Sequence, residues 1–362
     1  MAKKQTADSA DSLQKFKQDL KNDALGRFYI FCGDEAFLRE HYLSQLTKKF
    51  SDGPAAEFNV HRFDASNLTP QALLDAVEAM PMMAERTLVR VDDVDLFKLP
   101  EHAREQYREI FEDLPDYVCL VFVYDTVEFR PNGQLRKLSD TLKKHAQVVS
   151  FQKPSERELG VWIARHFRAE GKTISDKLIT YLIFLTGGGM TQLSGEIKKV
   201  SAYCSGSEIQ RSDIDAVVTP ALSAQTFDIS DAVTAGNFQL ALTKLQEDFE
   251  TALGKLQELY AMQTEPIAIL GAIGSQLRRL FYAKTLASCG KGQPALMELT
   301  GLKSSYAAGR TFTSARSVSE AFCQTAVELC CQADRDLKTS RDDPERILEV
   351  LVVRLSQEAR RG

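Results

Sequence analysis

Residues 118–125 read VCLVFVYD, and this stretch decides the fold of the N-terminal part of the chain. Seven apolar or aromatic residues in succession precede Asp125, so a strand made from them would have both of its faces buried. A strand of this kind is typical of the centre of a parallel sheet that helices cover on both sides. The stretch therefore predicts an α/β domain built around residues 118–124.

Strand and helix patterns alternate along the chain on both sides of this stretch. Further strands are expected at 28–33 (FYIFCG), 58–63, 86–91 (RTLVRV) and 147–151 (QVVSF). Helical spacing lies between them, and Thr69 followed by Pro70 is a typical start of a helix. Strands separated by helices indicate a doubly wound parallel sheet, which we expect over residues 26–152.

After Pro154 the strand patterns stop and only helical spacing remains. We expect a small helical domain at 153–220 and a larger helical domain at 221–362, because apolar residues recur there every three or four positions. Three such stripes are Ile267, Leu270, Ile273, Leu277 and Leu280; Phe322, Ala326, Leu329, Ala333 and Leu337; and Ile347, Leu351 and Leu355. Residues 1–25 are expected to be a tail followed by a short helix.

Composition and charge disfavour several classes of protein. The chain of 362 residues has 44% hydrophobic and 26% charged residues, as expected for folded globular domains. Its 45 basic and 50 acidic residues leave a formal charge of −5, too small for strong attraction to DNA or to membranes. The sequence has neither a run of about 18 apolar residues nor a secretion signal. The seven cysteines form no C-x-x-C pair, so we expect reduced thiols in a cytoplasmic protein without a membrane span or a structural zinc site.

The turn after residues 28–33 is where such a sheet would bind a nucleotide. A phosphate-binding loop needs a second glycine, a lysine and a Ser or Thr, which hold the phosphates and magnesium. Here the turn reads CGDEAFLR at 32–39 and has none of the three, while Asp34 and Glu35 would repel phosphate. Asp125 stands where a magnesium-holding carboxylate would, but a carboxylate that caps the next turn is the favoured interpretation. A divergent nucleoside triphosphatase stays open as an alternative, with Arg39 as its nearby cation.

The sequence contains no other pattern of catalytic or metal-binding residues. Its five histidines are scattered without the spacing of metal ligands, and no serine lies in a G-x-S-x-G turn. We therefore predict no catalytic residue, no cofactor and no metal ion.

Two adjacent methionines stand out in the connection before residues 86–91. Pro81 stops the preceding helix, and Met82 and Met83 follow it directly. Two neighbouring large apolar side chains in a connection cannot easily both point inward, and methionine is common on adaptable partner-binding surfaces. Burial of one or both under the edge of the sheet is the competing interpretation.

Three basic residues are candidates for contact with DNA: Arg130, Arg136 and Lys137. Acidic residues are interleaved with them, and no aromatic residues suggest stacking on bases. A solvent-exposed helix face is therefore the competing interpretation. A sequence-tolerant DNA-binding scaffold stays open as a further alternative for the whole chain.

Four segments together resemble the delta subunit family of the bacterial DNA polymerase III clamp loader. They are FYIFCGDEAFLRE (28–40), AMPMMAERTLVRVDDVDLF (79–97), LTGGGMTQLSGEIKKVSAYC (185–204) and DRDLKTSRDDPERILEVLVVRL (334–355). The resemblance runs from Gly26 to Leu355, and the segments follow the family's order. It implies an AAA+-like α/β domain with a degenerate nucleotide site at 26–152, a helical lid domain at 153–220 and a helical collar domain at 221–362.

The same resemblance implies a function and a binding site. Delta subunits bind the beta sliding clamp and open it for loading onto primed DNA during replication, without hydrolysing ATP themselves. The resemblance implies a hetero-pentamer with ATP-hydrolysing subunits and a delta-prime subunit, which contacts primer–template DNA as a complex. The chain would thus be a non-catalytic component of the polymerase holoenzyme. The family's apolar clamp-binding pair matches Met82 and Met83, which keep the volume of the usual Leu-Phe-like pair without its aromatic ring.

Overall fold

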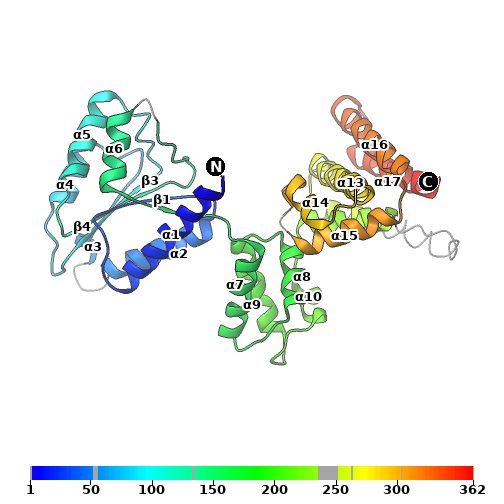
Figure 1. Cartoon of the computed structure of the whole chain (residues 1–362), viewed down its shortest axis with the longest axis horizontal. Helices are drawn as coiled ribbons and strands as arrows, with labels where there is room; N and C mark the ends of the chain where they lie inside the picture. Colours follow the sequence, from blue (N-terminus) through cyan, green and yellow to red (C-terminus); the bar gives the residue numbers. More distant parts are fainter. Residues whose placement is uncertain are drawn as a thin grey trace. The chain divides into compact units, whose positions relative to one another are not determined.

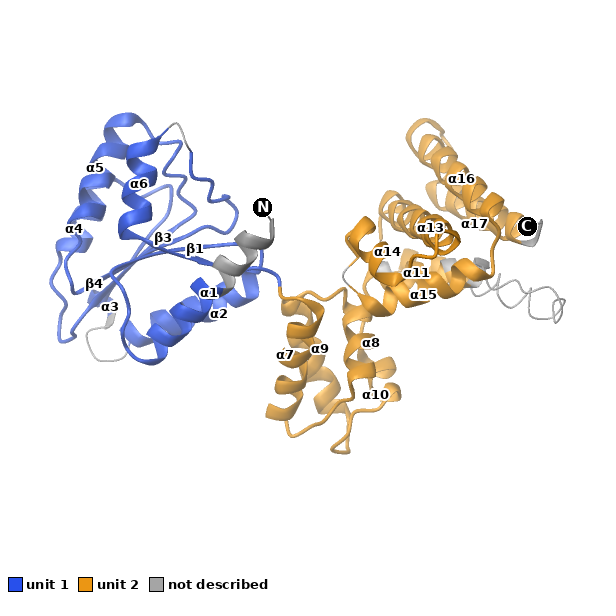
Figure 2. Cartoon of the chain, in the orientation of Figure 1, with its two compact units in different colours: residues 1–153 blue, residues 154–362 orange. Residues whose placement is uncertain are grey.

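The computed structural model describes residues 2–51, 56–132, 135–234, 252–261, 264–302 and 304–361 (Figure 1). The chain forms two compact units, residues 1–153 and 154–362, which Figure 2 shows in different colours. The boundary between them falls where the strand patterns of the sequence stop. The further division of the second unit into a lid and a collar stays a prediction.

The first unit contains a five-stranded sheet in which all neighbouring strands are parallel. Its strands are β1 (Phe28–Cys32), β2 (Val60–Phe63), β3 (Thr87–Asp92), β4 (Val118–Val123) and β5 (Gln147–Ser150). They lie in the order β2-β3-β4-β1-β5. β4 lies between β3 and β1 and is buried at every position, as its apolar sequence predicts. The predicted doubly wound parallel sheet is confirmed.

Helices cover both faces of this sheet, and each face has its own apolar core (Figure 1). One face packs against α4 (Pro70–Glu78), α5 (Glu101–Glu112) and α6 (Arg136–His145), and its strand residues include Phe28, Ile30, Leu120 and Phe122. The other packs against α1 (Ala2–Lys21) and α2 (Ala36–Phe50), and its strand residues include Tyr29, Phe31, Cys119 and Val121. Successive strand residues point to opposite faces, so a continuous apolar strand supplies both cores.

The N-terminal helix is longer than expected and belongs to the core of the first unit. In place of a tail and a short helix within residues 1–25, one helix runs from Ala2 to Lys21. Phe16 on this helix is 1% exposed. Its ring meets three others edge-on at centroid distances of 5.0–6.2 Å, namely those of Tyr29, Phe31 and Tyr42. Aromatic pairs in this arrangement stabilise a core beyond the area that they bury.

The strand expected at 58–63 begins two residues later than predicted. Phe58 and Asn59 end a short helix, α3 (Ala56–Asn59), and β2 starts at Val60. Periodicity alone does not distinguish helix from strand in so short an apolar run. As a consequence, Phe58 is 62% exposed and Asn59 is buried.

The regular secondary structure in the described residues of the second unit is helical, apart from one isolated bridge between Thr173 and Glu208. Its helices are α7 (Glu156–Ala169), α8 (Asp176–Thr186), α9 (Met190–Tyr203), α10 (Arg211–Val217), α11 (Leu222–Thr234), α13 (Pro266–Ser288), α14 (Gln293–Thr300), α15 (Ser305–Arg316), α16 (Glu320–Thr339) and α17 (Pro344–Arg361). The predicted apolar stripes form its core, except that Ile267 in the first turn of α13 is 58% exposed. Within the described part of the chain, no helix is both long and apolar enough to cross a membrane.

A charged and aromatic cluster joins α8, α11 and α15 within this unit. The Arg310 guanidinium on α15 forms ion pairs with Asp228 and Asp231 on α11. It also lies 5.3 and 5.7 Å from the ring centroids of Phe184 and Phe227. Because α8 falls in the predicted lid and the other two helices in the predicted collar, the cluster connects these parts.

Candidate functional site

The turn between β1 and α2 is closed by an internal arginine. The Arg39 side chain is 5% exposed, and it donates to the Gly33 carbonyl at 2.7 Å and to the Asp125 carboxylate. Gly33 has a φ of +116°, and a Cβ at this position would lie 2.4 Å from the Phe151 carbonyl oxygen. Only glycine fits such a backbone. The turn is therefore packed against the chain that follows β5, and the Arg39 cation is already paired.

Aspartates at the ends of β3 and β4 act as structural acceptors. Asp93 Oδ1 accepts three backbone N–H groups at 2.7, 3.0 and 3.2 Å, those of Asp125, Thr126 and Val127. Its Oδ2 accepts the Thr126 hydroxyl at 2.9 Å. The residue that caps the turn after β4 is thus Asp93, and the interpretation of Asp125 as that cap is wrong. Asp125 instead accepts from Arg39.

Among the described residues, no group of three or more His, Cys, Asp or Glu side chains could hold a metal ion. Burial raises the pKa of the Cys32 thiol to about 11 and those of Cys119 and Cys330 to about 12. These thiols therefore stay protonated and unreactive near neutral pH. Burial also lowers the pKa of the His61 imidazole below 6.5, so this side chain is neutral in the folded protein at pH 7.

Met82 and Met83 lie in an exposed connection between α4 and β3. α4 ends at Glu78, the chain bends at residues 82–85, and β3 begins at Thr87. The exposed fraction is 84% for Met83, 50% for Met82 and 81% for the nearby Met80. Burial of the pair under the edge of the sheet is therefore the wrong interpretation. We call residues 80–83 the methionine tip.

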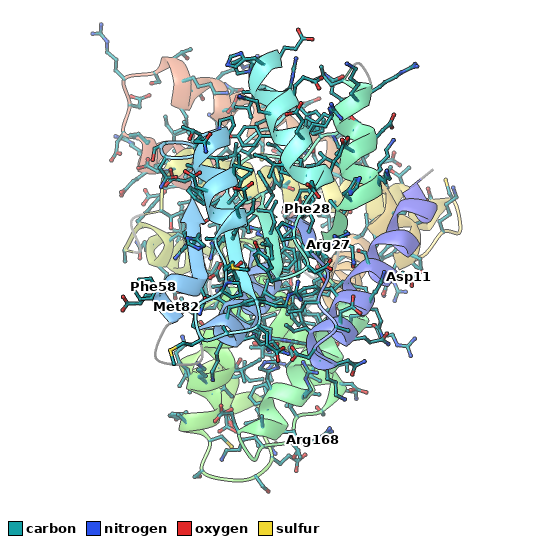
Figure 3. All side chains as sticks on the ribbon, turned by 90° about the vertical axis from the view of Figure 1, so that its left-hand side faces the viewer. Asp11, Arg27, Phe28, Phe58, Met82 and Arg168 are labelled. Carbon is teal, nitrogen blue, oxygen red and sulfur yellow. The ribbon has the colours of Figure 1, made fainter. Side chains whose placement is uncertain are left out.

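The side chain of Asn59 holds the backbone of the methionine tip. Asn59 Nδ2 donates to the Met82 carbonyl oxygen at 2.8 Å, and the Met82 N–H donates to Asn59 Oδ1 at 2.7 Å. Asn59 is 3% exposed, and Figure 3 shows its neighbour Phe58 on the same edge of the first unit as Met82. The sequence does not predict this role of Asn59, because no local pattern marks a partner 23 positions away.

The three basic residues proposed to face DNA lie on the surface near α6, but two of them have acidic partners. Arg130 forms an ion pair with Glu128 at 2.5 Å, and Lys137 Nζ lies 3.7 Å from a Glu105 carboxylate oxygen. Arg136 is exposed at the first position of α6. The pairing favours the interpretation of a solvent-exposed face for Arg130 and Lys137.

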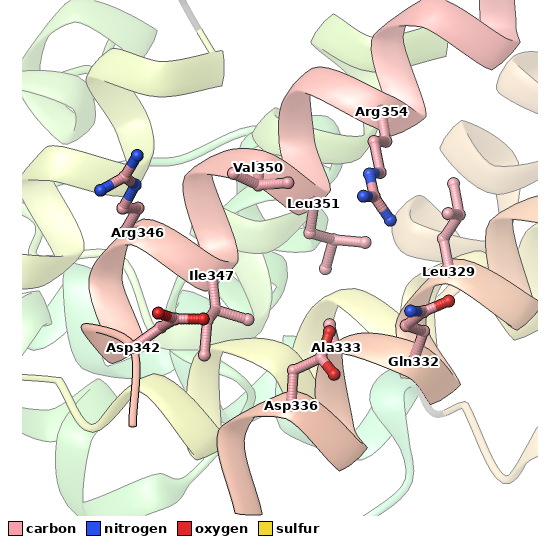
Figure 4. Close-up of a pocket in the computed structure, with 10 residues that line it drawn as sticks. All are labelled: Leu329, Gln332, Ala333, Asp336, Asp342, Arg346, Ile347, Val350, Leu351 and Arg354. Atoms are coloured by element: carbon pink, nitrogen blue, oxygen red, sulfur yellow. The ribbon is translucent and has the colours of Figure 1, made fainter. Parts of the chain in front are cut away.

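Two grooves in the second unit were not predicted from the sequence. One, of about 350 Å³, lies between α16 and α17 and is shown in Figure 4. It is lined by Leu329, Gln332, Ala333, Asp336, Asp342, Arg346, Ile347, Val350, Leu351 and Arg354. The other, of about 650 Å³, lies between α7 and α8 and includes Arg157, Arg165 and Arg168 in its lining.

Comparison with known proteins gives consistent matches along the chain. The family model for "DNA polymerase III, delta subunit" matches residues 29–152, and the model for "DNA polymerase III delta subunit, C-terminal domain" matches residues 224–355. DNA polymerase III subunit delta of Bacillus subtilis (strain 168) is 24% identical over 346 residues, which are 93% of this chain and 95% of that protein. The probable subunit delta of Aquifex aeolicus (strain VF5) is 21% identical over 297 residues, 77% of each chain.

A solved structure shares the fold. The DNA clamp loader delta protein of Bacillus subtilis superimposes with a TM-score of 0.58 at 21% sequence identity. The match covers 95% of this chain and 99% of that one. The fold is therefore shared over nearly the whole length of the two proteins.

Proposed function

The chain belongs to the DNA polymerase III delta subunit family and is a clamp-loader subunit; from this premise we propose that it binds and opens the beta sliding clamp for loading onto primed DNA. It would act in the bacterial cytoplasm within a hetero-pentamer that contains ATP-hydrolysing subunits and a delta-prime subunit. Primer–template DNA would be held mainly by the assembled complex, in keeping with a net charge of only −5 on this chain.

The observation that carries this proposal is the exposure of the methionine tip. Met83 and Met82 expose 84% and 50% of their surfaces, whereas the competing interpretation placed them under the edge of the sheet. Exposed apolar side chains that enter a pocket on a partner supply most of the binding energy of many protein interfaces. The resemblance of this pair to the family's clamp-binding pair supports the beta clamp as its partner.

The state of the degenerate nucleotide site supports a role without ATP hydrolysis. The turn after β1 lacks the lysine and hydroxyl that would hold phosphate and magnesium. Arg39, the cation that a divergent nucleotide site would need, is buried and bonded to Gly33 and Asp125. Energy for the loading cycle would therefore come from ATP bound by the partner subunits.

Clamp opening follows from differential binding. A ligand shifts an equilibrium between two states only by the difference between its affinities for them. The methionine tip would thus bind the open clamp more tightly than the closed clamp. A shift from 1% to 99% open would require about a 10⁴-fold difference in affinity.

The test is binding of the purified chain to the sliding clamp of the same organism without nucleotide. We expect Met82→Ala/Met83→Ala to weaken binding at least tenfold without lowering the melting temperature, because both side chains are exposed. Val161→Ala/Leu299→Ala is a matched control, since it removes two residues of the second unit that are 67% and 60% exposed. Equal affinities for wild type and the methionine variant would refute the assignment of the site. If wild type does not bind alone, absence of binding by the assembled loader would refute the function.

A further inference from the structure

We propose that Asn59 is a positioning residue for clamp binding, which holds the methionine tip in its binding conformation; this inference rests on the function proposed above. Asn59 does not need to contact the clamp for this role, because only 3% of its surface is exposed. It acts instead on the backbone of Met82, whose N–H and carbonyl groups both bond to its side-chain amide.

The pairing between Asn59 and Met82 is reciprocal. The amide oxygen accepts from the Met82 N–H at 2.7 Å, and the amide nitrogen donates to the Met82 carbonyl at 2.8 Å. An asparagine side chain supplies a donor and an acceptor in one plane, as a peptide group does. Exchange of its oxygen and nitrogen would break both bonds, so the contact fixes one orientation of the amide. Neither aspartate nor leucine, which have similar size, could make both bonds.

The methionine tip needs such an anchor because most of its side-chain surface is exposed and its backbone has an uncommon conformation. Residues 82–85 lie outside any helix or strand, and Met83 and Met80 are 84% and 81% exposed. Met83 also has a φ of +54°, a backbone conformation that residues other than glycine adopt uncommonly. The two hydrogen bonds to the buried Asn59 side chain favour this backbone conformation over the other conformations that an exposed loop can adopt.

The expected effect follows from the population of the binding conformation. The apparent Kd equals the intrinsic Kd divided by the fraction of molecules in the competent conformation. If loss of the anchor reduces that fraction to about one tenth, the apparent Kd of Asn59→Ala rises about tenfold. The apolar side chains that enter the clamp are unchanged in this variant.

The experiment measures clamp affinity for wild type, Asn59→Ala, Met83→Ala and the combination of both changes. We expect each single change to weaken binding and the two losses to multiply, because Asn59→Ala lowers the competent fraction whereas Met83→Ala raises the intrinsic Kd. Asn67→Ala is the matched control: Asn67 accepts a backbone N–H from Asp64 within an exposed turn of the same unit. Its affinity should equal that of wild type.

The outcomes separate this inference from the proposed function. Wild-type affinity for Asn59→Ala, together with weak binding by Met83→Ala, would overturn the positioning role and leave the function intact. A combined loss clearly different from the product of the two would also overturn it, since Asn59 would then not act through the competent fraction. Wild-type affinity for Met83→Ala would instead count against the proposed site.

A second readout needs no clamp. Hydrogen exchange of the Met82 amide should become faster in Asn59→Ala, while exchange in β3 and β4 stays unchanged. An unchanged Met82 rate would overturn the inference, because the contact would not protect that group in solution. If Asn59→Ala does not fold, Asn59→Leu replaces it in both experiments. Leucine has a similar size but neither a donor nor an acceptor for the Met82 backbone, so the same weakening and the same refutation apply.

Discussion

The two methionines of the tip should contribute unequally to clamp binding. We predict that Met83→Ala weakens binding more than Met82→Ala, because the energy available from burial in a partner's pocket depends on how much apolar surface is still exposed. Met83 exposes 84% of its surface and Met82 only 50%. The remaining half of Met82 is already covered within its own unit and gains nothing further from the clamp.

The exposed fractions set the size of the two effects. Burying a fully exposed methionine side chain contributes about 1.5–3 kcal/mol. Scaled by exposure, Met83→Ala should cost about 1.3–2.5 kcal/mol, and Met82→Ala about 0.8–1.5 kcal/mol. These energies correspond to a rise in Kd of about 10- to 60-fold for Met83→Ala and about 3- to 12-fold for Met82→Ala.

Isothermal titration or surface plasmon resonance with the cognate clamp would measure both values. Leu299→Ala serves as the control, because Leu299 is 60% exposed but lies on α14, outside the methionine tip. Thermal unfolding of each variant should match wild type closely, since exposed side chains contribute little to stability. An effect of Met82→Ala equal to or larger than that of Met83→Ala would refute the reasoning from exposure, and so would a loss of similar size for Leu299→Ala.

Two further predictions concern stability. Phe16→Ala should lower the free energy of unfolding by about 3–5 kcal/mol, because the ring is 1% exposed and packs edge-on against Tyr29 and Phe31. Urea denaturation would measure this loss. A loss below about 1 kcal/mol would show that α1 is not part of the core. Burial lowers the pKa of His61 in the folded state. As the pH falls through 6.5, the unfolded state therefore takes up a proton that the folded state does not, and the free energy of unfolding decreases. His61→Phe should be less sensitive to pH between about 7 and 5.5 in the same assay, and an unchanged slope would contradict the assignment to His61.

Local sequence patterns were sufficient for the sheet and for the exclusion of a conventional phosphate-binding loop. The apolar run at 118–123 predicted a covered central strand, and β4 is buried at every position. Thr69 and Pro70 likewise begin α4 as expected, with the Thr69 hydroxyl accepting from the Ala72 N–H. These features depend on neighbours in the chain, so they are visible in the sequence. The missing lysine of the phosphate loop is visible for the same reason.

The tertiary structure decided the features that depend on residues far apart in the chain. Arg39 meets Asp125 across 86 positions, and Asn59 meets Met82 across 23. No local pattern marks either pair, because a side chain's partner is set by the path of the chain around the sheet. Phe16 gives the same lesson: the sequence predicted a tail and a short helix within residues 1–25, yet the Phe16 ring packs against aromatic rings of β1 and α2.

The sequence by itself therefore determined the doubly wound sheet, the helical second unit, the family and the identity of the two candidate methionines. Whether those methionines are buried or exposed could not be read from the sequence, since a turn can direct an apolar side chain to either side. The tertiary structure answered that question by exposing both and by placing the buried Asn59 beneath them. The physical reason is that periodicity encodes which face of an element is apolar, whereas contacts between elements arise only when the chain is packed.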